Sequence, residues 1–448
     1  MIYDMLEPDQ SELVNSVKAT MPYSKSILLQ SCTGSGKTFM AMAMIEMAYR
    51  KSGGNIIFTV PRKTLADQTS DSFNSLGIDH SYIASGRPYN PYSRVYIGMI
   101  PTMASRLDNL PDAKIIFIDE THYGEGYLNK LVAHYKARGT YIIGLSATPW
   151  KMNGKGLGCY YDSMVVGKSM RWLIDHNRLS DYRYFRGRTQ LELDRLRVSN
   201  GDYNKKDVSE FMESKPMIIG DAVNDYRNLA MGRLHVVRCP SVKHSQMTAQ
   251  AFRDAGIQAV HVDGDTPELE RRRIFKSYAR RELLVLCFCD LLTFGFDLSQ
   301  ASGGMDVTIE SGDDLKPNMS LAEWLQFMGR MLRKKTEPAL IFDRVNNYKE
   351  HGLPCAEREW TLEDRKQGKR DKERVQPTRQ CDECFHIHKP SPVCPECGYV
   401  YKVKSRTIDE VDGELQEVDK EAIKLEKKKE RQKQGQAKTL DDLVPLGS

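Results

Sequence analysis

Long apolar runs are missing from this sequence, and none reaches the ~20 residues that a membrane-spanning helix needs. The first residues, Met-Ile-Tyr-Asp-Met-Leu-Glu, lack the basic start and the apolar core of a secretory signal. Charge of one sign is not in large excess either: the net charge of +5 is compatible with nucleic-acid binding without indicating it. We therefore expect a cytoplasmic protein that is neither secreted nor inserted in a membrane.

Cysteines suited to disulfides are also scarce. Without secretion, the 10 cysteines favour free thiols plus a metal site, because four of them cluster late in the chain. The cluster reads Cys381-Asp-Glu-Cys384 and Cys394-Pro-Glu-Cys397. Two such knuckles a short loop apart place four thiolates around one tetrahedral Zn²⁺, although paired disulfides or redox motifs share the pattern and His386 or His388 could replace a cysteine. So small a segment cannot bury a core, so the metal would supply its folding energy, on the order of 10 kcal/mol or more.

What the sequence does contain is an alternation of short apolar strands and helices. At 448 residues the chain should hold two or three domains. We expect strands at residues 26–30, 55–60, 95–98, 114–118 and 141–145 in the first half, and at 234–238, 258–262, 283–287 and 339–342 in the second. This order predicts an α/β fold of two doubly wound parallel sheets, with ligands at the carboxyl ends of the strands. Between the two halves, residues 153–158 predict a flexible link.

A phosphate-binding loop is predicted at Ser31-Cys-Thr-Gly-Ser-Gly-Lys-Thr38, between a buried strand and an apolar helix. Gly34 and Gly36 let backbone N–H groups close around phosphate oxygens, with Thr33 and Ser35 in the same loop. Lys37 would reach the β- and γ-phosphates, and the Thr38 hydroxyl would hold Mg²⁺. Ser31 departs from the general pattern, which has a glycine there. An ordinary glycine-containing turn is the alternative, and the second half has no such loop.

An acidic pair, Asp119-Glu120, follows the strand at 114–118, with His122 close behind. One carboxylate at a strand end suits the Mg²⁺ shell, and its neighbour suits orienting or deprotonating the attacking water. An acidic turn in solvent is the alternative. The occurrence of this acidic pair after a phosphate loop favours the catalytic interpretation.

Taken in order, these stretches resemble superfamily 2 helicases of the DExH type. Gln10 and residues 31–38, 61–68, 119–122 and 146–148 are similar to the Q motif and motifs I, Ia, II and III. Thr293-Phe-Gly-Phe-Asp297 is similar to motif V, and Gln326-Phe-Met-Gly-Arg-Met-Leu-Arg333 to motif VI. Within the superfamily, residues 154–158, 263–267, 292–297 and 341–343, with the cysteines behind the motor, are most similar to bacterial RadD and related phage DEAD/DEAH-box helicases.

The resemblance implies two RecA-like domains with ATP in the cleft between them. Arg330 and Arg333 would then reach the γ-phosphate, and Gly295 and Asp297 would approach the ribose and phosphates. An Arg-x-x-Arg pair on a helix is otherwise most often a solvated face. Gln10 would read the adenine edge by donating and accepting together. Residues 146–148 would link the γ-phosphate state to domain closure, or simply cap the following turn.

For nucleic acid, the resemblance implies a groove that follows the backbone across both domains. The candidate contacts, each of which could be an ordinary surface residue, are Arg62, Gly86, Thr102, Lys243 and Thr266. Basic residues also precede and enter the cysteine cluster: Lys366, Lys369, Arg370, Lys372, Arg374, Arg379 and Lys389. We expect the zinc ribbon to grip nucleic acid, with packing on the second domain or docking of a protein as alternatives.

The expected organisation has four parts: residues 1–152 and 153–352 as the RecA-like domains, 353–400 as a basic linker with the zinc ribbon, and 401–448 as a charged tail, helical or disordered. The predicted function is a nucleic-acid-stimulated ATPase that unwinds or remodels DNA, with ATP, Mg²⁺ and Zn²⁺ as cofactors. Single-stranded, forked or branched DNA is the expected partner, with replication or recombination proteins. An RNA helicase, a translocase that strips proteins from DNA, and a clamp with little ATPase activity are the alternatives.

Overall fold

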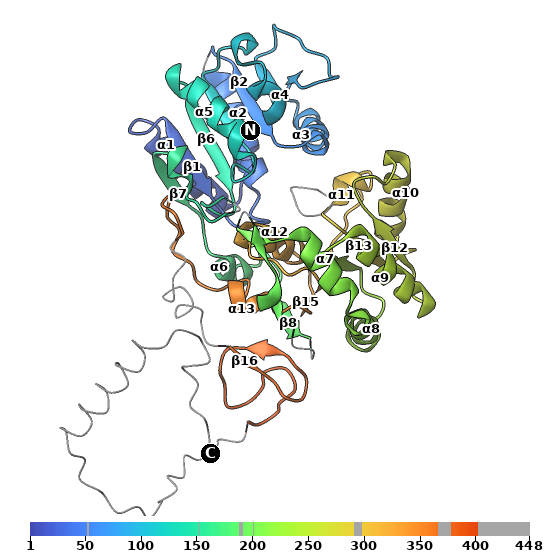
Figure 1. The fold of residues 1–448 in the computed structure, drawn as a ribbon. Coiled ribbons are helices and arrows are strands. Elements are labelled where there is room, and N and C mark those ends of the chain that lie inside the picture. Colours follow the sequence, from blue (N-terminus) through green and yellow to red (C-terminus); the bar gives the residue numbers. More distant parts are fainter. Residues whose placement is uncertain are drawn as a thin grey trace, which may run out of the picture. The chain divides into compact units, whose positions relative to one another are not determined.

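The first parallel sheet of the computed structural model has seven strands in the order β3-β4-β2-β5-β6-β1-β7. Figure 1 labels β1, β2, β6 and β7 of this sheet. The structure describes residues 1–51, 53–151, 153–187, 191–199, 201–290, 298–365 and 378–401. The strands are β1 Ser26–Gln30, β2 Ile56–Val60, β3 Ser81–Ile83, β4 Val95–Met99, β5 Ile115–Ile118, β6 Tyr141–Ser146 and β7 Ser163–Val166. The five predicted strands of this half are present, and β3 and β7 were not predicted.

Helices cover both faces of this sheet. They are α1 Pro8–Thr20, α2 Lys37–Lys51, α3 Lys63–Ser75, α4 Ile100–Ala104 and α5 Glu125–Ala137, with the short 3-10 helices η1 Ile2–Met5, η2 Leu107–Asn109 and η3 Leu157–Cys159. Ile27 and Leu29 of β1 join the core under α1, α2 and α3, whereas Leu28 joins the core under α4 and α5. Alternate side chains of one strand are therefore buried on opposite faces, as a doubly wound sheet requires.

The second parallel sheet has six strands in the order β12-β13-β11-β14-β15-β8. They are β8 Tyr182–Arg186, β11 His235–Arg238, β12 Ala259–Val262, β13 Val285–Phe288, β14 Ser311–Asp314 and β15 Ala339–Asp343. Around it lie α6 Met170–Asp175, α7 Lys205–Glu213, α8 Pro216–Asp225, the π-helix η5 Tyr226–Ala230, α9 Val242–Asp254, α10 Glu268–Ala279, α11 Leu298–Ala301, α12 Leu321–Met331 and α13 Tyr348–His351. The 3-10 helix η4 Leu193–Arg195 and the hairpin strands β9 Val198–Ser199 and β10 Asp202–Tyr203 complete this part.

Strand β14 was missed because its sequence, Ser-Gly-Asp-Asp, contains no large apolar residue. Both carboxylates are nevertheless fully buried in the middle of the sheet. Asp314 accepts two hydrogen bonds from the Arg238 guanidinium, and Asp313 lies 2.9 Å from His235 Nε2. The bonded partners of these two carboxylates explain how so polar a strand can lie inside the sheet.

A segment of residues 353–365, which we call the strap, runs from the end of the second sheet onto the first domain. Its Leu362 carbonyl accepts a hydrogen bond from Gly158 N at 2.9 Å, and its Asp364 carboxylate accepts one from Gly156 N at 2.8 Å. A Cβ on Gly156 would lie 2.1 Å from the Leu362 oxygen. The prediction of a free flexible link at residues 153–158 is therefore wrong, because its glycines admit the strap backbone.

The zinc-ribbon segment forms the small strands β16 Arg379–Gln380 and β17 Ile387–His388. It packs on β8, where Phe185 pairs with His386 through a backbone bridge and Arg183 forms an ion pair with Glu396. Strand β7 pairs with β1, so the first sheet continues past residue 152, where the first predicted domain ends. The predicted domain limits stay predictions. The predicted charged tail lies outside the described residues apart from Tyr401. No helix within the described ranges is long and apolar enough to cross a membrane.

Candidate active site

Three adjacent strands bring the predicted phosphate chemistry to one edge of the first sheet. The phosphate loop follows β1, the acidic pair follows β5 and Ser146 ends β6, and these strands are neighbours in the order β5-β6-β1. Both pairings, β5 with β6 and β6 with β1, are parallel, so the carboxyl ends of the three strands meet at the same edge. The predicted residues of the two motifs therefore lie together.

The phosphate loop has the backbone that its glycines predict. Gly34 and Gly36 both have φ of +85°, in the left-handed region that glycine adopts without strain. Lys37 is the first residue of α2, and its Nζ donates to the carbonyl oxygens of Ser31 and Cys32 at 3.0 and 3.2 Å. Ser31, at the position where a glycine was expected, places its Oγ 2.7 Å from Ser35 Oγ. The lysine is thus held over the loop, with Thr38 one residue further along the helix.

Gln10 is attached to this loop through its side-chain amide. Its Nε2 donates to the Ser35 carbonyl at 2.8 Å, and its Oε1 accepts from Glu7 N at 3.1 Å. Gly36 has a φ of +85°, and a Cβ on it would lie 2.4 Å from the same Nε2, so a larger residue would be strained and would displace the Gln10 amide. The amide fastens α1 to the loop in this structure, and its reading of adenine stays a prediction.

The acidic pair sits on a strained turn. Glu120 has φ of +47°, and its N–H donates to Asp119 Oδ1 at 3.0 Å. Burial, followed by the neighbouring Glu120 charge, raises the pKa of Asp119 to about 7. A buried carboxyl of this kind is matched by a divalent cation, which would favour its ionised form. The oxygen donors of Asp119 and Thr38 therefore fit Mg²⁺.

His122 links this pair to the end of β6. Its Nδ1 lies 3.0 Å from Ser146 Oγ and 3.5 Å from Glu120 Oε2. Burial lowers the pKa of His122, which favours the neutral ring at neutral pH. Ser146 Oγ also accepts from Thr148 N at 3.2 Å, so residues 146–148 are connected to Glu120 through this histidine.

Helix α12 adds a group from the second sheet. Gln326 Nε2 donates to Glu120 Oε2 at 2.9 Å and lies 3.4 Å from His122 Nε2. A Cβ on Gly329 would lie 2.4 Å from Thr33 Cβ, so the helix rests directly on the loop. Gln326 was not among the predicted site residues. The available signal was its place four residues before Arg330 in the same helix.

The contact between α12 and the phosphate loop also places the backbone of the two predicted arginines. Arg330 comes directly after Gly329 in α12, and Arg333 pairs through its backbone with Leu179. Leu179 in turn would touch a Cβ on Gly34 at 3.0 Å. Both arginines thus start from backbone beside the phosphate loop. Gly295 and Asp297 lie outside the described residues.

The predicted nucleic-acid residues of the first sheet occupy its other half, since Arg62, Gly86 and Thr102 follow β2, β3 and β4 in the order β3-β4-β2. The Arg62 guanidinium lies over the Tyr123 ring at 5.6 Å. On the second sheet, Lys243 forms a 2.7 Å ion pair with Glu213, and Thr266 Oγ1 donates to Asp263 at 3.0 Å. The carboxyl edge of the first sheet is therefore divided between the two sets of predicted residues.

The four late cysteines converge. Their Sγ atoms all lie within 4.8 Å of one another, with Cys381 and Cys397 3.5 Å apart and Cys384 and Cys394 3.7 Å apart. Four soft ligands at this spacing fit one tetrahedral Zn²⁺. His386 and His388 are directed elsewhere: the first packs against the Phe185 ring and the second contacts the Lys389 carbonyl.

Two family models match the chain: "Type III restriction enzyme, res subunit" over residues 4–151 and "Helicase conserved C-terminal domain" over residues 219–335. A protein named "51.5 kDa protein" from Lactococcus phage (isolate 7-9) is 31% identical over 404 residues, covering 89% of this chain and 83% of that one. A protein of Schizosaccharomyces pombe named "Putative mitochondrial ATP-dependent helicase irc3" is 26% identical over 65% of this chain. The chain spans 50% of the length of that relative.

Solved structures share the fold. The ATP-dependent Type ISP restriction-modification enzyme LlaBIII, solved bound to DNA, is 13% identical with a TM-score of 0.55, covering 76% of this chain and 27% of that one. The DUF1998 helicase MrfA, also solved bound to DNA, is 14% identical with a TM-score of 0.52, covering 76% and 49%. These likenesses, with the two parallel sheets, confirm the tandem RecA-like fold.

Proposed function

Since this chain belongs to the superfamily 2 helicases and is an ATP-dependent nucleic-acid helicase, we propose that its substrate is DNA, which it unwinds or remodels in replication, recombination or repair. Forked or branched DNA is the favoured form. The proposal of DNA follows from the motif resemblance to RadD, and two proteins with this fold were solved bound to DNA.

One observation carries the proposed mechanism: Gln326 of α12 donates to Glu120 of the first domain at 2.9 Å. The site is therefore complete only when both domains contribute to it. A glutamate held in this way, beside the neutral His122, is positioned to accept the proton of an attacking water.

The remaining roles follow from placement. The loop amides of residues 33–36 and Lys37 bind the phosphates. Thr38 and Asp119 would hold Mg²⁺, which would supply charge neutralisation at the phosphoryl oxygens. Arg330 and Arg333 stabilise the charge that develops in phosphoryl transfer, an effect typically worth about 10³–10⁵ in rate. Gln10, bonded to the Ser35 carbonyl, is proposed to contact the adenine. For Gly295 and Asp297 the proposed contacts with the ribose and phosphates rest on the motif resemblance alone.

For the nucleic acid, we propose that the residues of the β3-β4-β2 edge and those after β11 and β12 contact the backbone without reading sequence. The ribbon holds Zn²⁺ and grips DNA where strands part. Its packing on β8 equally supports the alternative of a structural ribbon, so removal of residues 368–448 decides between them. A gripping ribbon predicts weaker fork binding and a shallower salt slope, by roughly 0.7 per lost phosphate contact on single strands. An unchanged slope leaves the structural role.

The deciding experiment measures ATPase rates with single-stranded, duplex, forked and branched DNA and with RNA, using Glu120→Gln as the matched inactive control. We expect DNA to stimulate hydrolysis most, and forks to exceed duplex. Stimulation by RNA equal to that by DNA would indicate an RNA helicase. Tight nucleic-acid binding with a rate no higher than that of Glu120→Gln would indicate a clamp.

A further inference from the structure

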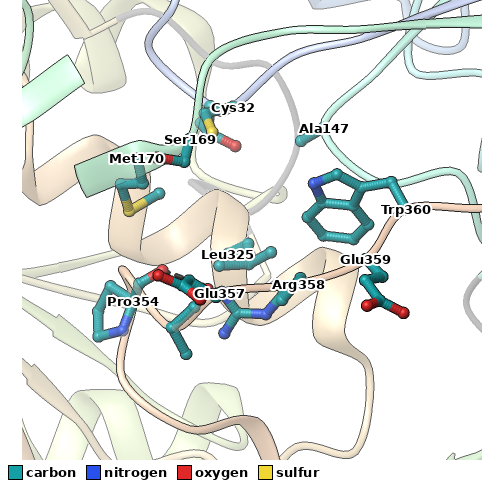
Figure 2. A pocket seen from close by; sticks show the side chains of 12 residues that line it. Cys32, Ala147, Ser169, Met170, Leu325, Pro354, Glu357, Arg358, Glu359 and Trp360 are labelled. Carbon is teal, nitrogen blue, oxygen red and sulfur yellow. Dashed lines mark hydrogen bonds between the residues drawn. The ribbon is translucent and has the colours of Figure 1, made fainter. Parts of the chain in front are cut away.

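A cavity of about 470 Å³ borders the start of the phosphate loop (Figure 2). One wall consists of Cys32 and Thr33 of the loop and Ala147, which follows β6. Figure 2 shows Cys32 facing the strap, which carries Arg358 on the opposite side of the cavity. The cavity therefore has nucleotide-binding residues on one side and a cationic side chain on the other.

The strap is a fixed wall. Its Trp360 ring packs on Trp150 with centroids 5.2 Å apart, and the Trp150 Nε1 donates to the Glu363 carbonyl at 2.9 Å. The contacts of Gly156 and Gly158 with the strap backbone add to these. A side chain on this wall thus keeps its position relative to the first domain.

Arg358 is held by neutral groups. Its Nη1 donates to the carbonyl oxygens of Pro354 and Ala356 at 3.1 and 2.9 Å, and its Nη2 donates to those of His351 and Leu353 at 2.8 and 3.2 Å. Carbonyl dipoles satisfy these N–H groups but leave the positive charge uncancelled. Among the residues that the structure describes, no carboxylate forms an ion pair with Arg358. Burial lowers the pKa of Arg358 to about 10, so it stays charged at neutral pH.

Met170 and Leu325 contribute apolar surface to the rest of the cavity. Two carboxylates, those of Glu357 and Glu359, also line it, but both residues are exposed to solvent, so water and salt screen their charges. A cation shielded from water is costly unless an anion lies near it. The arrangement is therefore complementary to a small anion that enters the cavity.

We propose that this cavity binds a phosphate anion beside Cys32 and Thr33 of the phosphate loop, with Arg358 as its counter-charge. The inference rests on the proposed function, because hydrolysis at the loop produces orthophosphate beside Thr33. The same chemistry has two sources: orthophosphate leaving after hydrolysis, or the γ-phosphoryl group of bound ATP.

Direct binding tests the site without any turnover. Inorganic phosphate is titrated calorimetrically into the full chain carrying Lys37→Ala, so that the loop itself contributes little binding. We expect Arg358→Met to weaken phosphate binding at least tenfold in this background. Arg365→Met is the matched control, because Arg365 lies on the same strap over the Trp150 ring and does not line the cavity. Equal affinity in all three chains overturns the proposal, whatever the ATPase assays show.

The two sources are separated in chains with intact Lys37. Quenched-flow measures hydrolysis, and a fluorescent phosphate sensor measures release. If the cavity takes departing orthophosphate, Arg358→Met changes release at least fivefold and leaves hydrolysis unchanged. If it takes the γ-phosphoryl group, hydrolysis itself slows and release follows at the same rate.

Because the Arg358 guanidinium also binds backbone carbonyls of the strap, Arg358→Met could unfold this segment. A second variant therefore tests the charge without removing Arg358. Ala356→Glu places a carboxylate on the cavity wall and leaves the backbone carbonyls that bind Arg358. We expect it to abolish phosphate binding, whereas Ala356→Gln, of the same size and neutral, retains it. Loss of binding in both, with melting temperatures equal to that of the parent chain, would refute the electrostatic argument.

Discussion

Gly329→Ala tests the contact between α12 and the phosphate loop. An added Cβ would lie 2.4 Å from Thr33 Cβ and 2.6 Å from Thr33 Cγ2. Carbon atoms pack best at ~3.5–4.0 Å, so the helix would have to move back by about 1 Å. A shift of that size in a catalytic group typically costs about 10² in rate, or ~2.7 kcal/mol of transition-state stabilisation. We therefore expect kcat to fall about a hundredfold.

Folding should not account for this loss. Alanine is a better helix former than glycine by about 1 kcal/mol, which offsets part of the roughly 1–3 kcal/mol that the close contact costs, so the melting temperature should fall only slightly. Gly220→Ala in α8 is the matched control, because a Cβ there meets nothing within 4 Å. It should give the same helix gain with full activity.

The assay is steady-state ATPase at saturating ATP and nucleic acid, with melting temperature and nucleotide affinity measured on the same samples. Affinity should change much less than kcat, because the loop and Lys37 are untouched. A Gly329→Ala chain with wild-type kcat would refute the conclusion that α12 must rest on Thr33 for catalysis.

Three further predictions follow from the site. Glu120→Gln should abolish turnover and keep nucleotide binding, whereas Lys37→Ala should weaken both; rates and fluorescent-nucleotide titrations check this, and near-normal turnover in Glu120→Gln would contradict it. Burial raises the pKa of Asp119 from 3.8 to about 7, so the folded chain holds a proton that the unfolded chain has lost. In buffer without Mg²⁺ the free energy of unfolding should thus fall as the pH rises from about 3.8 to about 7. Denaturant titrations across this range should show a smaller fall for Asp119→Asn, and an unaltered curve would count against the assignment. Zinc removal by a chelator, or Cys381→Ser with Cys384→Ser, should lower the melting temperature, with zinc content measured in parallel; full stability without metal would show that the ribbon folds unaided.

The sequence predicted those elements that depend on interactions between residues close together in the chain. The strands at β1, β2 and β5 are continuous apolar runs, and burial on both faces explains their composition. The phosphate loop was equally readable, because glycine at 34 and 36 and lysine at 37 serve a backbone conformation that needs no distant partner. These features were present as expected.

What could not be predicted depends on partners far away in the chain. Strand β14 buries two aspartates whose charged partners lie elsewhere in the chain: Arg238 of β11 pairs with Asp314, and Arg344, which follows β15, pairs with Asp313. Gln326 gains its place in the site from a bond to Glu120, 206 residues away. The glycines at 156 and 158 suggested freedom, whereas they make room for the strap. Side-chain type alone does not reveal such contacts.

The packing of the ribbon on β8 also has a consequence for the association of this protein with other copies of itself. In the described residues β8 is the outermost strand of the second sheet, and its neighbour on the open side is the segment held by the four cysteines. An uncovered outer strand offers unpaired N–H and C=O groups to any other extended chain. We therefore expect that loss of metal from the four thiolates would uncover β8 and expose it to pairing with other copies of this chain.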